Sequence, residues 1–588
     1  MRACSIIKVD LGEESNMSDL LYEPLKYYES EGSAKHRQNV EAYFDELVKR
    51  SALDIEGNRK TVVKYKEKLS QIKKLSKKNF WLKFLRVVFI IAAAFGGIAF
   101  LYGAVNTAWL PILIGALVTA GSLTLIFLFV NKKIKSLTEK IEEQRLEADV
   151  ILKEAWAQMA CLNRLFTRRD TFNLIEKTLP EIKFDDTFLA ERERELVELY
   201  DYEPDNDDDK SVVDSLSGKF GDKPFLYERY LVKEIRDEIY HGYRTISYTQ
   251  TYRDSKGNIR TRTVTQTLHA SVVKPKPYYY EDTFLNFGAQ GAPELSFTRE
   301  GMHHEDKSER QINRLIKKGE KKLKKRAEEA LAKGESFTEM ANTEFDVLFG
   351  AHDRNHEVQF RMLFTPLAQN NMVDLMRSEA GYGDDFDFYK FERRNIIHSD
   401  HAQKWKMDTD VSNYLSYDYD AVRRSFIDYN IEYFKSVFFD FAPILAIPLY
   451  HDKAVKSLEK PKEYKLNFTM QEYECLANRL PADSLAPLGA KTATIYNATG
   501  LSCTDGRDRV RIRACSHDAI PRTDFVMVLG GDGRMHSVPV PWTEYIPIVR
   551  ETDISVMRDT PENRESAAGD ISCYHGLIAA HMILSKTK

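Results

Sequence analysis

Residues 87–130 read VVFIIAAAFGGIAFLYGAVNTAWLPILIGALVTAGSLTLIFLFV, and the stretch contains no Asp, Glu, Lys, Arg or His. A bilayer core takes about 20 apolar residues per helix, so a stretch of this length predicts two membrane spans rather than one. We expect the spans at 85–102 and 109–130, joined by a short uncharged turn. Pro111 then falls in the first turn of the second helix, where a missing N–H costs least. The sequence therefore predicts a transmembrane hairpin.

Basic residues flank this stretch on both sides, whereas the turn between the spans carries no charge. The flanking residues are Lys73, Lys74, Lys77, Lys78, Lys83 and Arg86 before it, and Lys132, Lys133 and Lys135 after it. Because positive charge stays on the cytoplasmic side, we expect a protein of the cell membrane with both termini in the cytoplasm. The alternative is a buried helical hairpin of a soluble protein, but a soluble core rarely excludes charge over two full helices.

Apolar residues recur at mostly three- and four-residue steps on both sides of the spans, which is typical of amphipathic helices. A membrane hairpin brings its two cytoplasmic ends together. The sequence therefore predicts an antiparallel helical stalk, a coiled coil whose arms are 36–84 and 131–180. Packing of both arms on a globular domain is the alternative.

The bulk composition is that of an ordinary folded protein, so the rest of the chain is expected to form a folded cytosolic part attached to this anchor. The chain has 588 residues, a net charge of -4 and six cysteines. This charge gives no global attraction to nucleic acid, and six thiols in so long a chain indicate a reduced compartment rather than a disulfide framework. Residues 1–16 lack the apolar core of a signal peptide, and Met17 is an alternative start.

The fold class that follows is a membrane-anchored α+β protein. Its transmembrane hairpin is extended by the antiparallel helical stalk and followed by cytosolic α+β and β-rich domains. The expected segments are an N-terminal tail (1–35), stalk arm 1 (36–84), the hairpin (85–130), stalk arm 2 (131–180), an acidic linker with a β-hairpin-rich region (181–300), a basic amphipathic helix (301–335), an α+β domain (336–455) and a C-terminal β-rich domain (456–588).

Within the cytosolic part, residues 243–273 alternate as a β-hairpin without a strongly apolar face, so this ribbon is expected to project or to pair at a sheet edge. Residues 344–349 and 358–364 are apolar-rich and predict strands. Thr365 and Pro366 then predict the start of a helix.

A basic helix is predicted from Ser308 to Lys333. Its middle is crowded with lysines, namely Lys317, Lys318, Lys321, Lys322, Lys324 and Lys325. A solvated face, docking on anionic lipid head groups and nucleic-acid binding are the three interpretations of such a run. No stacking aromatic residues interleave with the lysines, which makes nucleic acid the least favoured partner.

A short run of the cytosolic part resembles an uncharacterised family of bacterial proteins. It consists of Glu344-Phe345-Asp346-Val347, then Asp353, then the nine residues 358–366, VQFRMLFTP. Members of that family look like two membrane spans followed by a cytosolic domain. The resemblance covers a few dozen residues and the architecture, and this chain departs from it by large additional regions. It implies a topology and no activity.

Enzyme signatures are mostly missing, since no Walker-type phosphate loop and no Gly-x-Ser-x-Gly elbow occurs. His398 and His401, around Asp400, form a small cluster that could hold a metal. The C-terminal part repeats a Cys-x-His unit as Cys515-Ser-His517 and Cys573-Tyr-His575. On a strand each unit would point to one face, and two units could form a Cys₂His₂ zinc site, although the usual two-residue gap between cysteines is missing.

These observations favour a non-enzymatic scaffold that is anchored in the lipid bilayer and binds a protein partner or itself, with no cofactor. The first alternative is a membrane-tethered hydrolase or zinc-dependent enzyme that uses the C-terminal cysteines and histidines. The second is an oligomeric pore built from the small residues of the spans, such as Gly96, Gly115 and Gly121.

Overall fold

The structure, a computed structural model, describes residues 22–105, 109–205, 207–253, 255, 257–304, 307–334, 336–378, 380–405, 408–451, 466, 468–504, 506–558, 571–575 and 578–582. Met17 and most of the expected N-terminal tail lie outside the described residues. The chain forms two compact units, one comprising Met1–His36, Phe172–Asp408 and Tyr433–Lys588, the other Arg37–Thr171 and Thr409–Glu432. Helices combine with antiparallel sheets, so the α+β class is confirmed, as are two long apolar helices in the N-terminal region.

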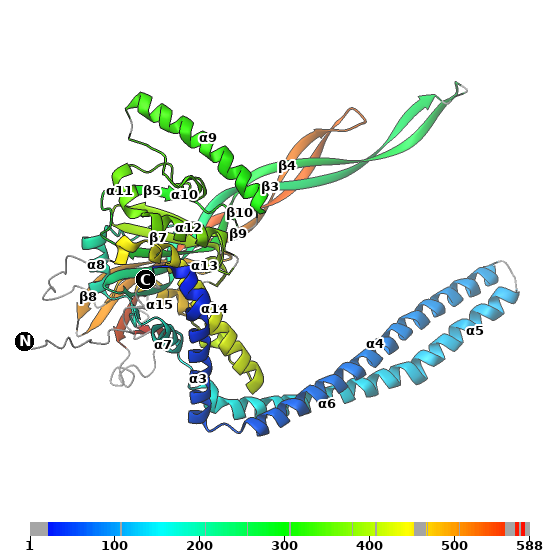
Figure 1. The fold of residues 1–588 in the computed structure, drawn as a ribbon. Helices are drawn as coiled ribbons and strands as arrows, with labels where there is room; N and C mark the ends of the chain where they lie inside the picture. The colour runs from blue at the N-terminus through cyan, green and yellow to red at the C-terminus, as the bar shows by residue number, and fades with distance from the viewer. Residues whose placement is uncertain are drawn as a thin grey trace, which may run out of the picture. The chain divides into compact units, whose positions relative to one another are not determined.

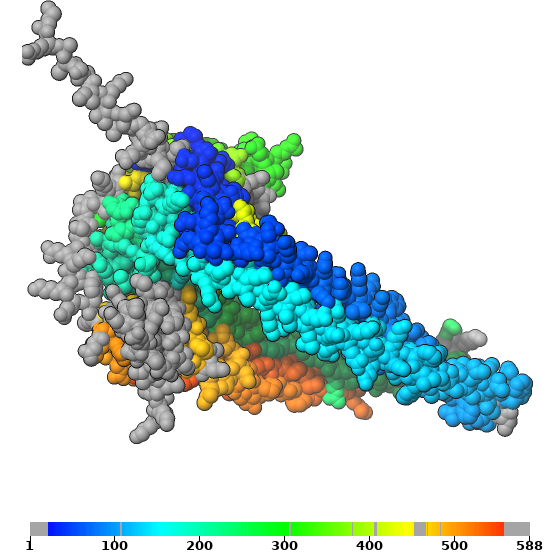
Figure 2. All heavy atoms as spheres, turned by 90° about the horizontal axis from the view of Figure 1, so that it is seen from below, coloured from blue at the N-terminus to red at the C-terminus, as the bar shows by residue number. Residues whose placement is uncertain are grey.

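The second unit is helical. Its main elements are α3 (Ser33–Ser51), α4 (Ile55–Val105), α5 (Trp109–Leu125), a π-helical turn (Ile126–Val130), α6 (Asn131–Asn163), a 3₁₀ turn (Val411–Asn413) and the first half of α14 (Tyr419–Leu445). Helix α4 continues without a break from a charged segment into the apolar stretch and lies beside α5 and α6 (Figures 1 and 2). The Nδ2 of Asn79 donates to the Oγ1 of Thr138 at 3.3 Å, and Lys68 forms an ion pair with Glu147 at 2.5 Å.

The first unit is built on a seven-stranded antiparallel sheet with the order β1-β2-β3-β4-β7-β6-β5. Its strands are β1 (Ile182–Phe184), β2 (Lys210–Phe220), β3 (Lys223–Arg253), β4 (Ile259–Gly288), β5 (Ser296–Arg299), β6 (Phe386–Phe391) and β7 (Arg394–Ser399). One face of the sheet carries buried Phe225, Tyr227 and Phe287, and all three rings contact Phe441 from the second half of α14.

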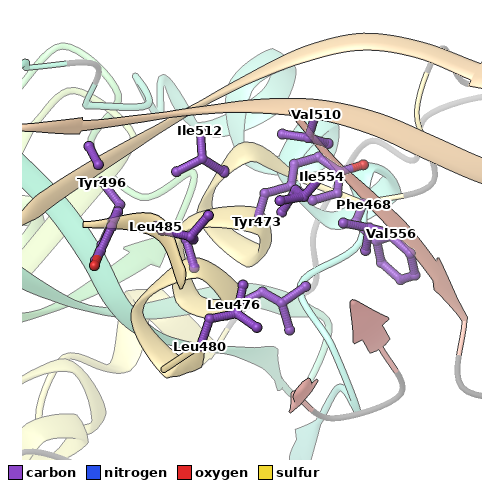
Figure 3. Packing of buried hydrophobic residues seen from close by; sticks show 12 residues of the cluster. Phe468, Tyr473, Leu476, Leu480, Leu485, Tyr496, Val510, Ile512, Ile554 and Val556 are labelled. Atoms are coloured by element: carbon purple, nitrogen blue, oxygen red, sulfur yellow. The ribbon is translucent and has the colours of Figure 1, made fainter. Parts of the chain in front are cut away.

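A second, five-stranded sheet has the order β11-β12-β10-β9-β8. Its strands are β8 (Ile495–Thr504), β9 (Arg507–Leu529), β10 (Met535–Arg558), β11 (Ile571–His575) and β12 (Ile578–Met582). Helix α15 (Met470–Arg479) packs Tyr473 and Leu476 against Val510 and Ile554 of this sheet, as Figure 3 shows. Burial of these side chains supplies the hydrophobic stabilisation of the C-terminal part.

Helix α15 also contacts the seven-stranded sheet, so it joins the two sheets. Cys475, on its other side, packs with Val212 and Tyr230. The Glu474 carboxylate accepts the N–H of Val212 from β2 at 2.8 Å and the N–H of Ala498 from β8 at 3.1 Å. Burial raises the pKa of Glu474 to about 8, against the lowering effect of these two bonds. One buried side chain thus satisfies backbone donors of both sheets.

Further helices complete the first unit. They are α2 (Pro24–Tyr27) with a π turn (Tyr28–Gly32), α7 (Arg168–Thr178, shared between the units), α8 (Ala190–Tyr200), α9 (Glu309–Lys333), α10 (Thr343–Phe349), α11 (Glu357–Leu363), α12 (Pro366–Arg377), α13 (Asp400–Trp405), a 3₁₀ turn (Pro448–His451) and α16 (Ala482–Leu485).

The prediction of strands at 344–349 and 358–364 is wrong, because both segments are helices, α10 and α11. Asn342 and His356 each accept a backbone N–H three residues on, which caps the two helices. The aromatic residues that suggested strands instead follow helical spacing, since Phe345 stacks on Phe349 and Phe360 contacts Phe364. The helix predicted at Thr365 and Pro366 is confirmed as α12.

The predicted β-hairpin at 243–273 is confirmed and is longer than expected, because β3 and β4 pair continuously from Phe225↔Phe287 to Arg253↔Ile259. Its expected turn includes residues 254 and 256, which lie outside the described residues. Strands β9 and β10 form a second long ribbon beside it (Figure 1). Buried Ile246 and Leu268 of the first ribbon contact Val538 and Val540 of the second. The weakly apolar face of the first ribbon is therefore covered within the unit.

The two ribbons approach closely at Gly242, where an added Cβ would lie 2.1 Å from the carbonyl oxygen of Pro539. We expect Gly242→Ala to push the ribbons apart and to lower the free energy of unfolding by about 2 kcal/mol, as overpacking of a core does. Chemical denaturation together with limited proteolysis of the ribbons measures this effect. Thr249→Ala, at an exposed position of the same strand, is the control and should change stability by less than about 0.5 kcal/mol. Equal curves for both variants would contradict the close packing.

Candidate functional sites

The apolar helices present large hydrophobic side chains to their surroundings. Phe95, Leu117 and Phe127 are 68%, 70% and 71% exposed. Within the described residues, two helical stretches are long and apolar enough to cross a membrane, Ile55–Val105 and Trp109–Asn163. Few residues of their apolar windows are buried inside the protein, unlike the core helices of a soluble fold. Water is an unfavourable solvent for such a surface.

Small residues lie where α4 and α5 contact each other. An added Cβ at Gly115 would lie 2.6 Å from the carbonyl oxygen of Gly96, and the Oγ1 of Thr119 donates to the Gly115 carbonyl at 2.7 Å. Gly97 and Gly121, in contrast, have open space around the added Cβ. Gly96 and Gly115 therefore lie in the contact between the two helices, whereas Gly97 and Gly121 lie outside it.

Helix α9 is the predicted basic helix, and a capping box formed by Ser308 and Gln311 starts it. Its buried side chains include Leu323 and Ala330, which pack with Phe337 and Val347. The predicted lysines lie on the exposed part of the helix: Lys317, Lys318, Lys321, Lys322, Lys324 and Lys325. Lys324 and Lys325 form ion pairs with Glu320 and Glu329 on the same helix, whereas no ion pair within the described residues involves the other four.

The first Cys-x-His unit lies on β9, where His517 is bound to its neighbours. The Nδ1 of His517 is 3.0 Å from the hydroxyl of Tyr279, and its backbone N–H donates to the Oγ1 of Thr492. Burial lowers the pKa of His517 and raises the pKa of the Cys515 thiol. A thiol with a raised pKa carries little thiolate at neutral pH, and thiolate is the form that attacks substrates and binds metals.

The second unit, Cys573 and His575, lies on β11, and its side chains are outside what the structure describes. Backbone pairing sets Cys573 opposite Ala580, which lies opposite Val556 of β10, while Cys515 lies opposite Val549. Val549 and Val556 are seven residues apart along β10, which corresponds to about 24 Å at 3.4 Å per residue. Among the described residues no group of three or more His, Cys, Asp or Glu side chains could hold a metal ion. The zinc site of Cys515, His517, Cys573 and His575 remains a prediction.

The histidine cluster predicted around Asp400 forms ion pairs in the structure. The two ring nitrogens of His398 lie 2.8 Å from Asp282 and 3.1 Å from Asp387. Those of His401 lie 2.7 Å from Asp385 and 3.1 Å from Asp440. Because both nitrogens of each ring face a carboxylate, each ring is suited to donate two hydrogen bonds as an imidazolium, and neither offers a lone pair to a metal.

The carboxylates stabilise the protonated form of both rings. Hydrogen bonds to Asp282 and then Asp387 raise the pKa of His398 to about 10. Burial lowers the pKa of His401, but the charges and hydrogen bonds of Asp440 and Asp385 outweigh it and raise that pKa to about 10 as well. The ion pairs of His398 join β7 to β4 and β6, and those of His401 join α13 to α14 and to Asp385, just before β6.

The raised pKa values make the stability of the first unit depend on pH. An unfolded histidine has a pKa near 6.5, so the stabilisation is complete below about pH 6.5 and is lost as the pH rises toward 10. We expect His398→Gln to cost about 2 kcal/mol at pH 6, because it leaves two carboxylates without their cation, and to cost much less at pH 10. Urea denaturation of both proteins across this range measures the difference. A cost that does not change with pH would contradict the ion-pair assignment.

A cavity of about 340 Å³ opens on the other face of the seven-stranded sheet. The register explains its floor, because Glu228 pairs with Phe284, Tyr230 with Asp282, and Ile396 with Tyr389. Strands β3, β4, β7 and β6 therefore present these side chains to one face. Glu203, Asp205 and Lys210 form a wall. We call this the sheet cavity.

Glu228 is the buried polar centre of the sheet cavity. Its carboxylate accepts hydrogen bonds from the hydroxyls of Tyr202 at 2.6 Å and Tyr230 at 2.8 Å, and from the Nδ2 of Asn286 at 2.9 Å. Burial raises the pKa of Glu228 to about 6, against the lowering effect of the tyrosine bonds. The Glu228 carboxylate and its three hydrogen-bond donors therefore form a rigid floor of the cavity. This site was not predicted from the sequence, although the alternation of acidic and aromatic residues at 228–230 and 280–284 is a signal that could have indicated it.

Comparison with protein-family models, with curated proteins and with solved structures finds no match to this chain.

Proposed function

We propose that this protein is a membrane-anchored scaffold: α4 and α5 form a transmembrane hairpin, α4 and α6 continue it as a stalk, and the α+β unit binds a partner in the cytoplasm. The observation that carries the proposal is the exposed apolar surface of α4 and α5, which lipid would cover. Basic residues at both cytoplasmic ends and an uncharged connection support the orientation.

An exposed apolar surface on the β9–β10 ribbon supports the binding role. Phe525, Met527, Leu529 and Met535 are each more than half exposed. Their register places them on one face, since Phe525, Met527 and Leu529 are two residues apart along β9 and Leu529 pairs with Met535 of β10. Contiguous apolar patches of this kind are typical of interaction sites. A protein partner or a second copy of the chain would cover it.

Anchoring and orientation can be tested with cysteine labelling in intact cells. We expect the chain to resist alkaline carbonate extraction and Val105→Cys, at the exposed end of α4, to react with a membrane-impermeant maleimide. The native exposed thiols Cys161 and Cys503 are internal controls, which should react only after the membrane is permeabilised. Release of the chain by carbonate, or labelling of Cys503 in intact cells, would contradict the proposal.

Anionic lipid head groups are the second partner that we propose. Four lysines of α9 have no ion-pair partner within the described residues, and each Lys near an anionic surface contributes about 1 kcal/mol of attraction. We expect Lys317, Lys318, Lys321 and Lys322 to react more slowly with an acylating reagent when the full chain sits in phosphatidylserine-containing vesicles than in phosphatidylcholine vesicles. Mass spectrometry of the modified lysines measures this.

Exposed Lys491, outside α9, serves as the control and should react equally in both lipids. Salt at about 1 M shortens the screening length to about 3 Å and should abolish the protection. Equal reactivity of the α9 lysines in the two lipids would show that their face is only solvated.

A further inference from the structure

Aromatic rings dominate the lining of the sheet cavity. Tyr230, Tyr280, Phe284, Tyr389 and Phe391 all contribute to it. Tyr280 and Phe391 are partly exposed, at 43% and 47%, whereas Tyr230 is buried at 6%. Tyr230 and Phe284 contact each other edge to face with ring centroids 6.5 Å apart. Tyr280 and Phe391 are therefore the rings of the lining that are most open to solvent.

The charged groups around these rings are mostly acidic. Glu203, Asp205, Glu228 and Asp282 line the cavity together with Lys210 and Arg394. Asp387 lies just outside, and shares His398 with Asp282. Five carboxylates thus face three cationic groups, Lys210, Arg394 and His398, so two negative charges are not balanced. Arg236 also lies nearby, 6.0 Å from the centre of the Tyr280 ring, but Glu234 pairs with it and leaves this difference unchanged. An anionic ligand would meet net repulsion there.

The cationic groups of the site are already engaged. Lys210 forms an ion pair with Asp205 at 2.6 Å. Arg394 donates from Nε to the Oδ1 of Asn286 at 2.9 Å, and its guanidinium lies 5.0 Å from the centre of the Tyr202 ring. Glu203, by contrast, is exposed at the wall, and no hydrogen bond or ion pair within the described residues involves it. The surplus negative charge is therefore available to an incoming group.

We infer that the sheet cavity binds a small organic cation that carries an alkylated ammonium group. Aromatic faces attract such cations through their quadrupoles when the charge lies within about 6 Å of the ring centre. A quaternary ammonium donates no hydrogen bonds, so it loses less than a primary ammonium on leaving water, and aromatic cages are its usual binding sites. Tyr280 and Phe391, the most exposed rings of the lining, are within reach of a ligand, and Glu203 and Asp282 supply the balancing charge. The volume of about 340 Å³ lies at the lower end of that of small-molecule sites.

The inference is independent of the membrane proposal, because it concerns the first unit alone. The experiment uses the full chain in a maltoside detergent, which has no ammonium head group, and titrates it with choline by isothermal calorimetry. The matched neutral probe is 3,3-dimethylbutan-1-ol, which has the shape of choline without its charge. We expect saturable binding of choline and at least about 10-fold weaker binding of the neutral probe.

Two variants locate the binding. Tyr280→Leu removes a partly exposed ring, and Glu203→Gln removes an exposed charge without touching the buried floor, so both should fold normally. Each should weaken choline binding by about 3- to 10-fold. Tyr252→Leu is the matched control, because Tyr252 has the same 43% exposure but lies near the far end of the β3–β4 ribbon and does not line the sheet cavity, and it should leave the affinity unchanged.

Equal affinity for choline and the neutral probe would overturn the inference, and so would equal effects of the Tyr280 and Tyr252 substitutions. Absence of saturable choline binding by the folded wild-type protein would overturn it as well. Binding of a lysine-containing peptide in preference to choline would assign the cavity to a protein partner and would also reject the small-molecule ligand.

Discussion

A stretch of more than forty residues without a charge must leave water, and this constraint organises the N-terminal part of the chain. Helices are the structures that satisfy their own backbone hydrogen bonds in an apolar solvent, and α4 and α5 are helical throughout their described apolar residues. The ion pair of Lys68 with Glu147 and the hydrogen bond of Asn79 with Thr138 lie in the charged continuations of the helices, whereas Thr119 and Thr124 in the apolar part donate to backbone carbonyls. The division between apolar and polar contacts along one continuous helix is what an anchor with a stalk requires.

The α+β unit obeys a different constraint, because it must bury polar groups as well as apolar ones. Glu474 accepts backbone N–H groups from both sheets, and Glu228 accepts three side-chain donors. His401 faces a carboxylate on each side of its ring. Unpaired, each of these groups would cost several kcal/mol in the interior. Paired, they help to fix which strands and helices meet, since each of these groups has at least one partner on another element.

Local signals in the sequence predicted the elements that depend on local physics. The basic helix begins at its Ser308 cap, α12 begins at Thr365 and Pro366, and the alternation at 243–273 becomes a ribbon. The segments 344–349 and 358–364 failed because short apolar runs fit either a strand or a helix, and their caps, Asn342 and His356, decide between the two. The histidine pairing with Asp282 and Asp440 could not be predicted, because those partners lie 116 and 39 residues away from His398 and His401 and only the fold brings them together.

The histidines and the thiol that the sequence offered as catalytic candidates are held in states that do not suit a general base or a nucleophile. A general base needs a free nitrogen or a carboxylate that can reach a substrate, and a nucleophilic thiol needs a lowered pKa. His398 and His401 have both nitrogens engaged, and burial raises the pKa of Cys515. Glu203 and the ring of Tyr280, in contrast, are open to solvent at the mouth of the sheet cavity. A cavity with a rigid floor and solvent-exposed groups at its mouth is suited to select a ligand by charge and shape. A scaffold that binds a small molecule would use this kind of recognition.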